Sequence, residues 1–447
     1  MRHSSAQNVW SGLAVVTLAV TAGCSSQEAP LPEDSLAGEL QVERTVEDGV
    51  EVVRNLSGSK WGGNATLAVE LEIGIDEGDE RYMFGNPYPF WITDEEIFVM
   101  EGGDGMVRVY GRDGEHRRDF GSLGEGPGEF SRGAQMTMNT SGQLAITMGS
   151  GNSVRTAFYT PDGEFLHEWR TQGNPGDRTY IVPVNPVPLD DSVLTRVMRM
   201  PEADSLDATD RETGFVRFDG DGYIGEPWFA PQSSFVPETM SFTFSAQGRD
   251  FTRQLPVPWT PRMVAAGAYD GSMIWSHADA YRFQIERPDG TQLAVERVAE
   301  QIAVDPGEAE YQRRSMVATM RQRTPDFDWD GSGTPDFKPW LRSIIADPTG
   351  RIWVSREGVA RRVEPCDEDP LALEQGERPV RCWETESLLD VFNSDGEFLG
   401  SLERPHGLVL LGPLINGTHM VAGYEDDFGV GKVRVYRILL PGDKIES

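Results

Sequence analysis

Basic residues are scarce in this chain, which carries 40 Lys and Arg against 72 Asp and Glu and a formal net charge of −32. A protein that binds nucleic acid needs a basic face to neutralise phosphates, so this charge argues against a nucleic-acid partner. Long apolar runs are also missing, and no stretch reaches the roughly 20 residues that a membrane-spanning helix needs. A hydrophobic content of 38% with 11 Trp is nevertheless ample for a folded core.

Recognisable catalytic motifs are missing too. The chain has six His, but none belongs to a His-x-His or His-Glu-x-x-His pair of the kind that binds catalytic zinc. No Gly-x-Ser-x-Gly sequence is present to supply a serine nucleophile. The Gly-rich stretch 120–130 does not lead from a strand into a helix, so we expect a turn there and no phosphate-binding loop. The sequence leaves enzymatic activity open and favours a binding protein.

The N-terminus has the features of an export signal. A short basic start precedes the apolar residues 9–20, and Ala22-Gly23-Cys24 follows. A basic start, a short apolar core and small residues before a cleavage point are typical of a secretory signal. Ala22-Gly23-Cys24 resembles the bacterial lipobox, which implies that Cys24 is acylated and becomes the first mature residue. An ordinary cleaved signal with a chance Cys is the alternative.

The lipobox resemblance also predicts a location. We expect a lipoprotein signal peptide at residues 1–23 and a lipid-anchored linker at residues 24–44. Several acyl chains on one Cys bury enough CH₂ groups for stable anchoring. Ser25 follows the Cys in place of Asp, which by resemblance implies an outer-membrane lipoprotein facing the periplasm or the outside. The membrane would then be one partner, and an envelope protein, peptide or glycan the other.

Cysteine is rare, and the chain contains only three. With Cys24 assigned to lipid, one pair remains, Cys366 and Cys382, in a segment rich in Pro, Asp and Glu. Disulfides persist in exported proteins, and two Cys without a nearby His cluster make a poor zinc site. We therefore predict a disulfide between Cys366 and Cys382.

Two short patterns alternate along the chain, and each occurs six times. The first is an apolar stretch, a turn and an alternating stretch, found at residues 92–99, 138–146, 187–194, 268–275, 345–354 and 414–421. The second is an alternating strand that leads into an Asp-Gly turn, and its examples begin at residues 107, 157, 215, 281, 389 and 433, the last of them without the turn. Asn, Asp and Gly supply the chemistry of tight hairpin turns in both patterns.

The two patterns together make four strands, and six such units predict an all-β fold, a six-bladed β-propeller over residues 45–447. A β-sandwich or two small β domains is the alternative, but the strict alternation of two hairpin types argues against both. The sixth unit lacks its last strand, whereas residues 65–73 alternate cleanly before the first unit. We expect this segment to close the ring as the outer strand of blade six, which removes an exposed edge.

Insertions interrupt the repeat at residues 226–262, 305–340 and 362–385. The first is rich in Trp and Phe, which could form a recognition surface for sugar or peptide, or core that packs the insertion onto the ring; we favour core. The second begins with a helix that Asp305 caps and Pro306 starts. The third is the segment around the two Cys. Insertions between blades often gather on one rim as the working face.

Several stretches resemble one family. Residues 120–130 (Phe-Gly-Ser-Leu-Gly-Glu-Gly-Pro-Gly-Glu-Phe), with residues 71–74 and 341–354, look like the corresponding parts of bacterial six-bladed propeller lipoproteins related to the NHL-repeat proteins. The resemblance covers nearly all of residues 45–440. It implies the propeller fold and an envelope location, and it offers no shared catalytic residues.

An acidic stretch follows the predicted helix. Its oxygen-bearing side chains alternate at Asp328, Asp330, Ser332, Thr334 and Asp336. Hard oxygen donors at alternate positions with Gly among them are typical of Ca²⁺ loops, although the Glu at position twelve of an EF-hand is missing. A solvated acidic linker is the alternative. Ca²⁺ is the one cofactor that the sequence suggests.

The leading functional hypothesis is a lipid-anchored binding or scaffold module of the cell envelope that presents one decorated rim to a partner. The alternative is a propeller-type, metal-dependent hydrolase or lactonase. In that case strand-end acids such as Asp94, Asp270 and Asp347 would converge on the central channel. The fold alone does not license the second hypothesis.

Overall fold

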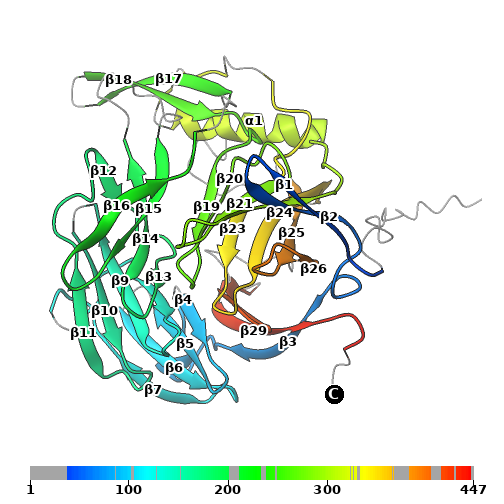
Figure 1. The fold of residues 1–447 in the computed structure, drawn as a ribbon. Coiled ribbons are helices and arrows are strands. Elements are labelled where there is room, and N and C mark those ends of the chain that lie inside the picture. The colour runs from blue at the N-terminus through cyan, green and yellow to red at the C-terminus, as the bar shows by residue number, and fades with distance from the viewer. Residues whose placement is uncertain are drawn as a thin grey trace, which may run out of the picture.

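The computed structural model describes residues 38–443, apart from residues 86, 102–104, 127, 152, 201–210, 233–237, 247–248, 323, 326, 330–332, 365, 367–381, 404–413 and 427–428. Six antiparallel sheets are arranged around a central axis, which confirms the predicted six-bladed β-propeller with one helix (Figure 1). In the described part of the chain, no helix is long and apolar enough to cross a membrane.

The first three blades follow one another along the chain. Blades one and two are regular meanders made of β4 (Pro87–Ile92), β5 (Glu96–Glu101), β6 (Met106–Gly111), β7 (His116–Phe120), β8 (Gln135–Met138), β9 (Leu144–Ser150), β10 (Ser153–Tyr159) and β11 (Phe165–Arg170). Blade three contains β12 (Thr179–Ile181), β13 (Val187–Pro188), β14 (Val193–Arg199), β15 (Glu212–Phe218) and β16 (Tyr223–Phe229). Both β12 and β13 pair with β14, so together they occupy the inner position of the blade.

The last three blades complete the ring. Blade four contains β19 (Val264–Gly267), β20 (Met273–Ser276), β21 (Arg282–Glu286) and β22 (Gln292–Arg297), and blade five contains β23 (Ser343–Ala346), β24 (Ile352–Arg362), β25 (Trp383–Phe392) and β26 (Phe398–Glu403). Blade six contains β27 (Leu414–Asn416), β28 (His419–Glu425), β29 (Gly431–Leu439) and, from near the N-terminus, β3 (Thr66–Ile73). The antiparallel pairing of β3 with β29 confirms the predicted closure of the ring.

An N-terminal hairpin widens blade four beyond four strands. Its strands are β1 (Gln41–Glu47) and β2 (Val50–Ser57), joined at an Asp48-Gly49 turn, and β2 pairs in parallel with β22. Because β1 begins at Gln41, regular structure starts inside the segment that we expected to be linker. Asn55 fixes the hairpin in place, since its buried amide donates to Glu296 O and Gly396 O and accepts from Phe398 N.

The recurrent Asp-Gly turns have a role between blades as well as within them. Gly163 and Gly396 have φ angles of 87° and 78°, a left-handed conformation that disfavours side chains. A Cβ atom would lie 2.7 Å from Phe120 at Gly163 and 2.6 Å from Val295 at Gly396, and both contacted residues belong to the preceding blade. Glycine is therefore required in these turns by backbone conformation and by the close approach of the neighbouring sheet.

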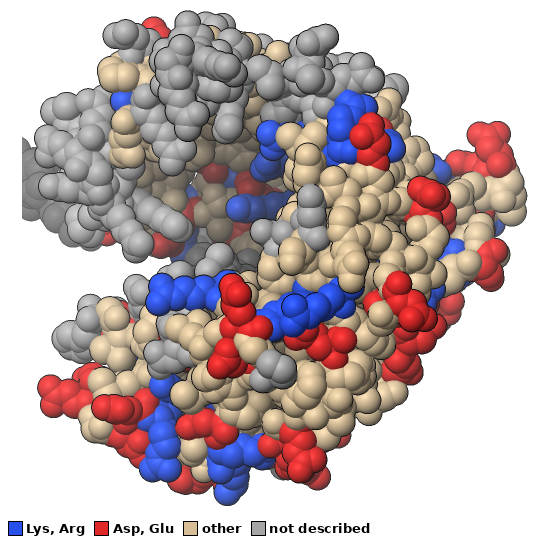
Figure 2. All heavy atoms as spheres, turned by 90° about the vertical axis from the view of Figure 1, so that its left-hand side faces the viewer, with Lys and Arg blue, Asp and Glu red and all other residues tan. Residues whose placement is uncertain are grey.

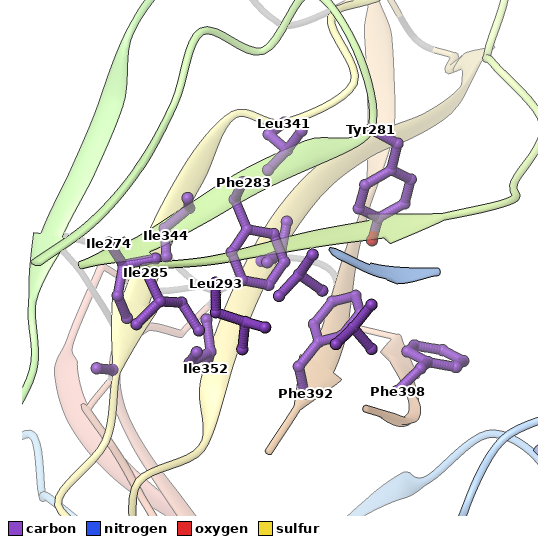
Figure 3. Packing of buried hydrophobic residues seen from close by; sticks show 14 of the residues in the cluster. Ile274, Tyr281, Phe283, Ile285, Leu293, Leu341, Ile344, Ile352, Phe392 and Phe398 are labelled. Carbon is purple, nitrogen blue, oxygen red and sulfur yellow. The ribbon is translucent and has the colours of Figure 1, made fainter. Parts of the chain in front are cut away.

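Neighbouring blades pack face to face through apolar side chains. Figure 3 shows the cluster between blades four and five, where Phe283, Ile285 and Leu293 meet side chains of the next sheet such as Ile352 and Phe392. Burial of each such side chain stabilises the fold by about 1.5–3 kcal/mol. Both faces of a blade are covered, so a central strand such as β5 buries side chains on both of its faces.

The insertions lie on one rim of the ring. Connections between the second and third strands of a blade and connections between successive blades emerge at the same end, because the strands are antiparallel. The predicted helix is confirmed as α1 (Pro306–Arg321), and Asp305 accepts hydrogen bonds from Gly307 N and Glu308 N. A hairpin of β17 (Thr239–Ala246) and β18 (Arg249–Pro256) lies near α1 at the top of Figure 1. Trp259 Nε1 links this insertion to Glu357 Oε2 of β24, 3.1 Å away.

Charged side chains of both signs are interspersed over the surface that Figure 2 shows, which also has a hollow below the insertions. Many acids are partnered by Arg across strands, as where Arg118 of β7 contacts Glu96 of β5 at 2.6 Å. A 3-10 turn, η2 (Glu80–Tyr82), lies between β3 and blade one.

Candidate functional site

The lipid and disulfide predictions concern residues near or beyond the limits of the described chain. Cys24 lies outside the described residues. Cys382 is buried just before β25, where its carbonyl accepts a hydrogen bond from Val363 N at 2.9 Å, and Cys366 is half-buried just after β24. The pairing of Arg362 with Trp383 places both Cys near the tip of one long hairpin. The intervening residues 367–381 are not described, so the disulfide stays a prediction.

The predicted calcium loop lies partly outside the described residues, because Asp330 and Ser332 are not placed. Asp328 is 81% exposed and 4.0 Å from Arg321. Asp336 is exposed, and its carbonyl accepts from Val304 N at 2.9 Å. Thr334 is half-buried. These contacts hold the ends of the loop against the protein, and calcium binding stays a prediction.

The strand-end acids of the hydrolase hypothesis belong to hairpin turns. Asp94 and Asp270 are exposed there. Asp347 is buried, but its carboxylate accepts from Thr349 N, Arg351 N and Trp353 Nε1 within its own hairpin. Among the residues that the structure describes, no group of three or more His, Cys, Asp or Glu is placed to hold a metal ion. The described structure does not bring these three acids together into one group.

The Gly-rich stretch 120–130 forms a turn between blades, as predicted. Its carbonyl groups surround one guanidinium: Arg155 donates to the oxygens of Gly124, Glu125, Gly126 and Glu129 at 3.1–3.3 Å. A phosphate-binding loop presents N–H groups to an anion. This loop presents carbonyl oxygens to a cation instead, so it is a structural connection.

A central cavity lies within the ring. It has a volume of about 110 Å³ and lies among the innermost strands of blades one to five. Most of its lining is apolar, and the lining side chains that carry oxygen or charge are Tyr88, Gln135, Thr137, Asn185, Arg196 and Tyr269. These residues come from β4, β8, β14 and the segments before β13 and β20, so only closure of the ring brings them together.

Arg196 is the cation of this cavity. It lies on β14 of blade three, and its Nη2 donates to the carbonyl of Ala265 on β19 of blade four. Burial lowers the pKa of Arg196, although an arginine side chain remains charged at any physiological pH. No carboxylate of the described chain pairs with it. A guanidinium has five N–H donors, so most of its capacity is left for a ligand.

Aromatic side chains also line the cavity. Tyr269 and Trp91 lie with ring centroids 6.4 Å apart, and Tyr88 Oη donates to Gln135 Oε1 at 3.4 Å. Burial raises the pKa of Tyr269, with a smaller contribution from Asp347, and burial also raises the pKa of Tyr88. Both hydroxyl groups therefore keep their protons at neutral pH and can donate hydrogen bonds.

Two further features mark the cavity wall. The Oγ1 atom of Thr137 is buried without a hydrogen-bond partner. Buried hydroxyl groups are usually satisfied, and an unpartnered one needs an explanation such as a bound group. Asn185 has a φ of 50° and is exposed beside the cavity. Left-handed non-glycine residues are uncommon and occur often at functional sites.

A second polar cluster lies between blades four and five. Asp390 on β25 is 1% exposed and accepts hydrogen bonds from Arg297, Tyr281 and Ser401, with Arg356 at 3.4 Å. Burial alone would raise the pKa of Asp390, but the two guanidinium groups with Ser401 and Tyr281 hold it below its ordinary value. Every polar partner is supplied by the protein, so this cluster is structural.

A third buried pair attaches the helix to the ring. Lys338 Nζ lies 3.0 Å from Glu308 Oε1 of α1 and donates to Gly358 O at 3.1 Å. Thr385 of β25 donates to the same Glu308 oxygen at 3.0 Å. These contacts hold the first turn of α1 against the long β24–β25 hairpin.

No family model and no curated protein matches this chain. Solved structures resemble it in fold. They include a member of the DUF4221 family from Bacteroides vulgatus, with a TM-score of 0.49 and 10% identity over 84% of this chain and 98% of that one.

A Bacteroides fragilis protein described as exported has a TM-score of 0.39 and 10% identity, covering 83% of this chain and 95% of its own. Virginiamycin B lyase from Staphylococcus aureus has a TM-score of 0.33 and 10% identity, covering 83% of this chain and 99% of its own. Likenesses at this level concern the fold alone and carry no argument about function.

Proposed function

We propose that this chain is a lipid-anchored binding propeller of the bacterial envelope that holds a small ligand in its central cavity. The observation that carries the proposal is the cavity itself. Aromatic rings, hydroxyl groups and one cation face a space that the ring encloses. Convergent polar groups in a largely apolar pocket are typical of ligand sites. The insertions on one rim offer a surface for an envelope protein, peptide or glycan.

The cavity is tested by blocking it. Val184 lies beside the cavity and is 48% exposed, so Val184→Trp adds bulk at the cavity without overpacking the core. Ala266→Phe, from β19, is a second blocking variant. Purified wild type and variants are dialysed against a periplasmic small-molecule extract, and retained compounds are identified by mass spectrometry. A compound enriched by the wild type and lost from both folded variants supports the proposal. Equal retention by all three proteins contradicts it.

The lipid anchor has a separate test. It rests on the sequence Ala22-Gly23-Cys24 after an apolar segment. We expect wild-type protein to fractionate with membranes and to carry the mass of acyl chains on its mature N-terminus. The Cys24→Ser variant should lose both properties. Membrane association of the variant with an unchanged N-terminal mass would contradict the anchor and leave cavity binding unaffected.

A further inference from the structure

We propose that the central cavity recognises a small organic carboxylate whose charge pairs with Arg196 and whose apolar part lies among Tyr269, Trp91 and the neighbouring aliphatic side chains. This inference rests on the proposed function, because it names the chemical class of the ligand that the cavity would hold.

The charge of the cavity calls for an anion. Arg196 is a desolvated cation whose side chain has one hydrogen bond to the protein, to Ala265 O, and no carboxylate partner in the described chain. Removing a charge from water without a partner is costly. Arginine pairs with carboxylates through two parallel N–H···O bonds. An entering carboxylate would therefore replace the hydrogen bonds to water that the guanidinium loses on burial.

The chain elsewhere neutralises such cations itself. Arg297 and Arg356 are buried to a similar or greater extent, and both reach Asp390. With 72 acidic residues in the sequence, acids are not in short supply. The lack of one beside Arg196 therefore indicates that an anion from outside the chain fits there.

Size and charge together favour a monoanion. The cavity of about 110 Å³ is smaller than the roughly 300–1,000 Å³ of sites for drug-sized ligands. It suits a small acid or the end of a longer molecule. One guanidinium matches one carboxylate, whereas a phosphate monoester carries close to two charges and would meet a protein of net charge −32.

The surface of the cavity suits a flat or branched apolar group. Tyr269 and Trp91 offer ring surface to the ligand, and the Tyr269 hydroxyl group can donate a hydrogen bond, whereas the Tyr88 proton is already donated to Gln135 Oε1. Arg196 is the charged side chain of this lining and contributes donors only, which again favours an acceptor-rich ligand such as a carboxylate.

A carboxylate could come from a free acid or from the C-terminus of a peptide. Isothermal titration calorimetry with the full soluble chain from residue 25 distinguishes them. The probes are benzoate and phenylacetate as free acids, and a tripeptide ending in Phe with either a free or an amidated C-terminus. Benzyl alcohol is the neutral control, and inorganic phosphate is the doubly charged control.

The expected result is binding of at least one carboxylate probe, with benzyl alcohol and the amidated peptide bound at least tenfold more weakly. Arg196→Gln should weaken carboxylate binding about 10- to 100-fold, the usual contribution of a charged hydrogen-bonding partner. Arg196→Lys should recover part of that loss. Arg132→Gln, at an exposed Arg outside the cavity lining, is the matched control and should bind as the wild type does.

Results that contradict carboxylate recognition can be told apart from results that contradict ligand binding by the cavity. Equal binding of benzoate and benzyl alcohol, or equal binding by wild type and folded Arg196→Gln, would overturn carboxylate recognition. So would no binding of any carboxylate probe at 10 mM. In each case a neutral or cationic compound retained from the extract and lost from Val184→Trp would leave the proposed function standing. Binding of the free-ended tripeptide alone would identify a peptide C-terminus as the source.

Discussion

Two places between blades hold buried arginines, and they differ in which groups of the protein pair with the guanidinium charge. Between blades four and five, Arg297 and Arg356 share Asp390, and the Arg297 guanidinium also lies 3.8 Å from the centre of the Phe398 ring. In the central cavity, Arg196 donates to a carbonyl and has no acid partner in the described chain.

This difference indicates that the Asp390 cluster serves the stability of the fold, whereas Arg196 serves ligand binding. A buried acid with several donors contributes to one particular packing of two blades, and losing it leaves charges that nothing else compensates. A buried cation without an acid contributes little to the fold and remains available to a ligand. Changes to either place should therefore have opposite consequences for folding and for binding.

The largest effect is expected at Asp390. Asp390→Asn would leave Arg297 and Arg356 buried without a counter-charge, and breaking such a cluster costs about 3–5 kcal/mol. Urea unfolding followed by Trp fluorescence measures the change in free energy. Glu51→Gln is the control, because it removes an exposed partner of Arg44 and should cost less than about 1 kcal/mol. Similar losses in the two variants would show that the Asp390 cluster is not a structural centre.

The next effect is expected where α1 joins the ring. Lys338→Met removes the cation that Glu308 contacts at 3.0 Å in a nearly solvent-free position, and we expect a loss of about 3 kcal/mol in urea unfolding. Adding Glu308→Leu to the same chain should recover part of that loss, since two apolar residues can replace a buried pair. A double variant less stable than the single one would contradict this account.

A smaller effect should appear as the pH falls. The pKa of Asp390 is lower in the folded protein than its ordinary value of 3.8, because its Arg partners outweigh burial. Its contribution to stability is therefore complete above about pH 4 and is lost as the pH falls through the folded pKa. Unfolding free energies measured from pH 7 to pH 3 should decline more steeply in the wild type than in Asp390→Asn. Parallel curves would assign the acid sensitivity to other carboxylates.

Local chemistry made the architecture predictable. Turns such as Asp162-Gly163 need left-handed glycine, the residues of β3 alternate along the strand, and Asp305 followed by Pro306 starts a helix. Each of these signals is contained within about ten residues of sequence. The parallel addition of β2 to blade four was missed, although its Asp48-Gly49 turn gave a hairpin signal, because pairing with β22 depends on assembly of the ring.

The candidate site could not be predicted in the same way. Arg196 lies in the middle of β14, whose other residues are mostly buried, and an Arg at such an interior position, unlike Arg199 at the strand's end, was the one available signal. Which of its faces meets the axis depends on how blades three and four close together. The partners of Asp390 are similarly remote, since Arg297 lies 93 positions away in the chain. Contacts of this range depend on the assembled ring, which short motifs do not encode.

The smallest change in stability is expected at Arg196 itself. Arg196→Gln removes a charge that has no carboxylate partner and keeps an amide that can still donate to Ala265 O, so the unfolding free energy should change by less than about 1 kcal/mol. Arg297→Gln is the matched variant: it takes one guanidinium away from Asp390 and should cost about 3 kcal/mol. Urea unfolding without added ligand compares the two directly. A loss at Arg196 as large as that at Arg297 would make both arginines structural, and the contrast between cavity and interface would disappear. A negligible loss combined with weaker carboxylate binding would instead separate the two roles in a single pair of variants, because stability and affinity would then respond to different arginines.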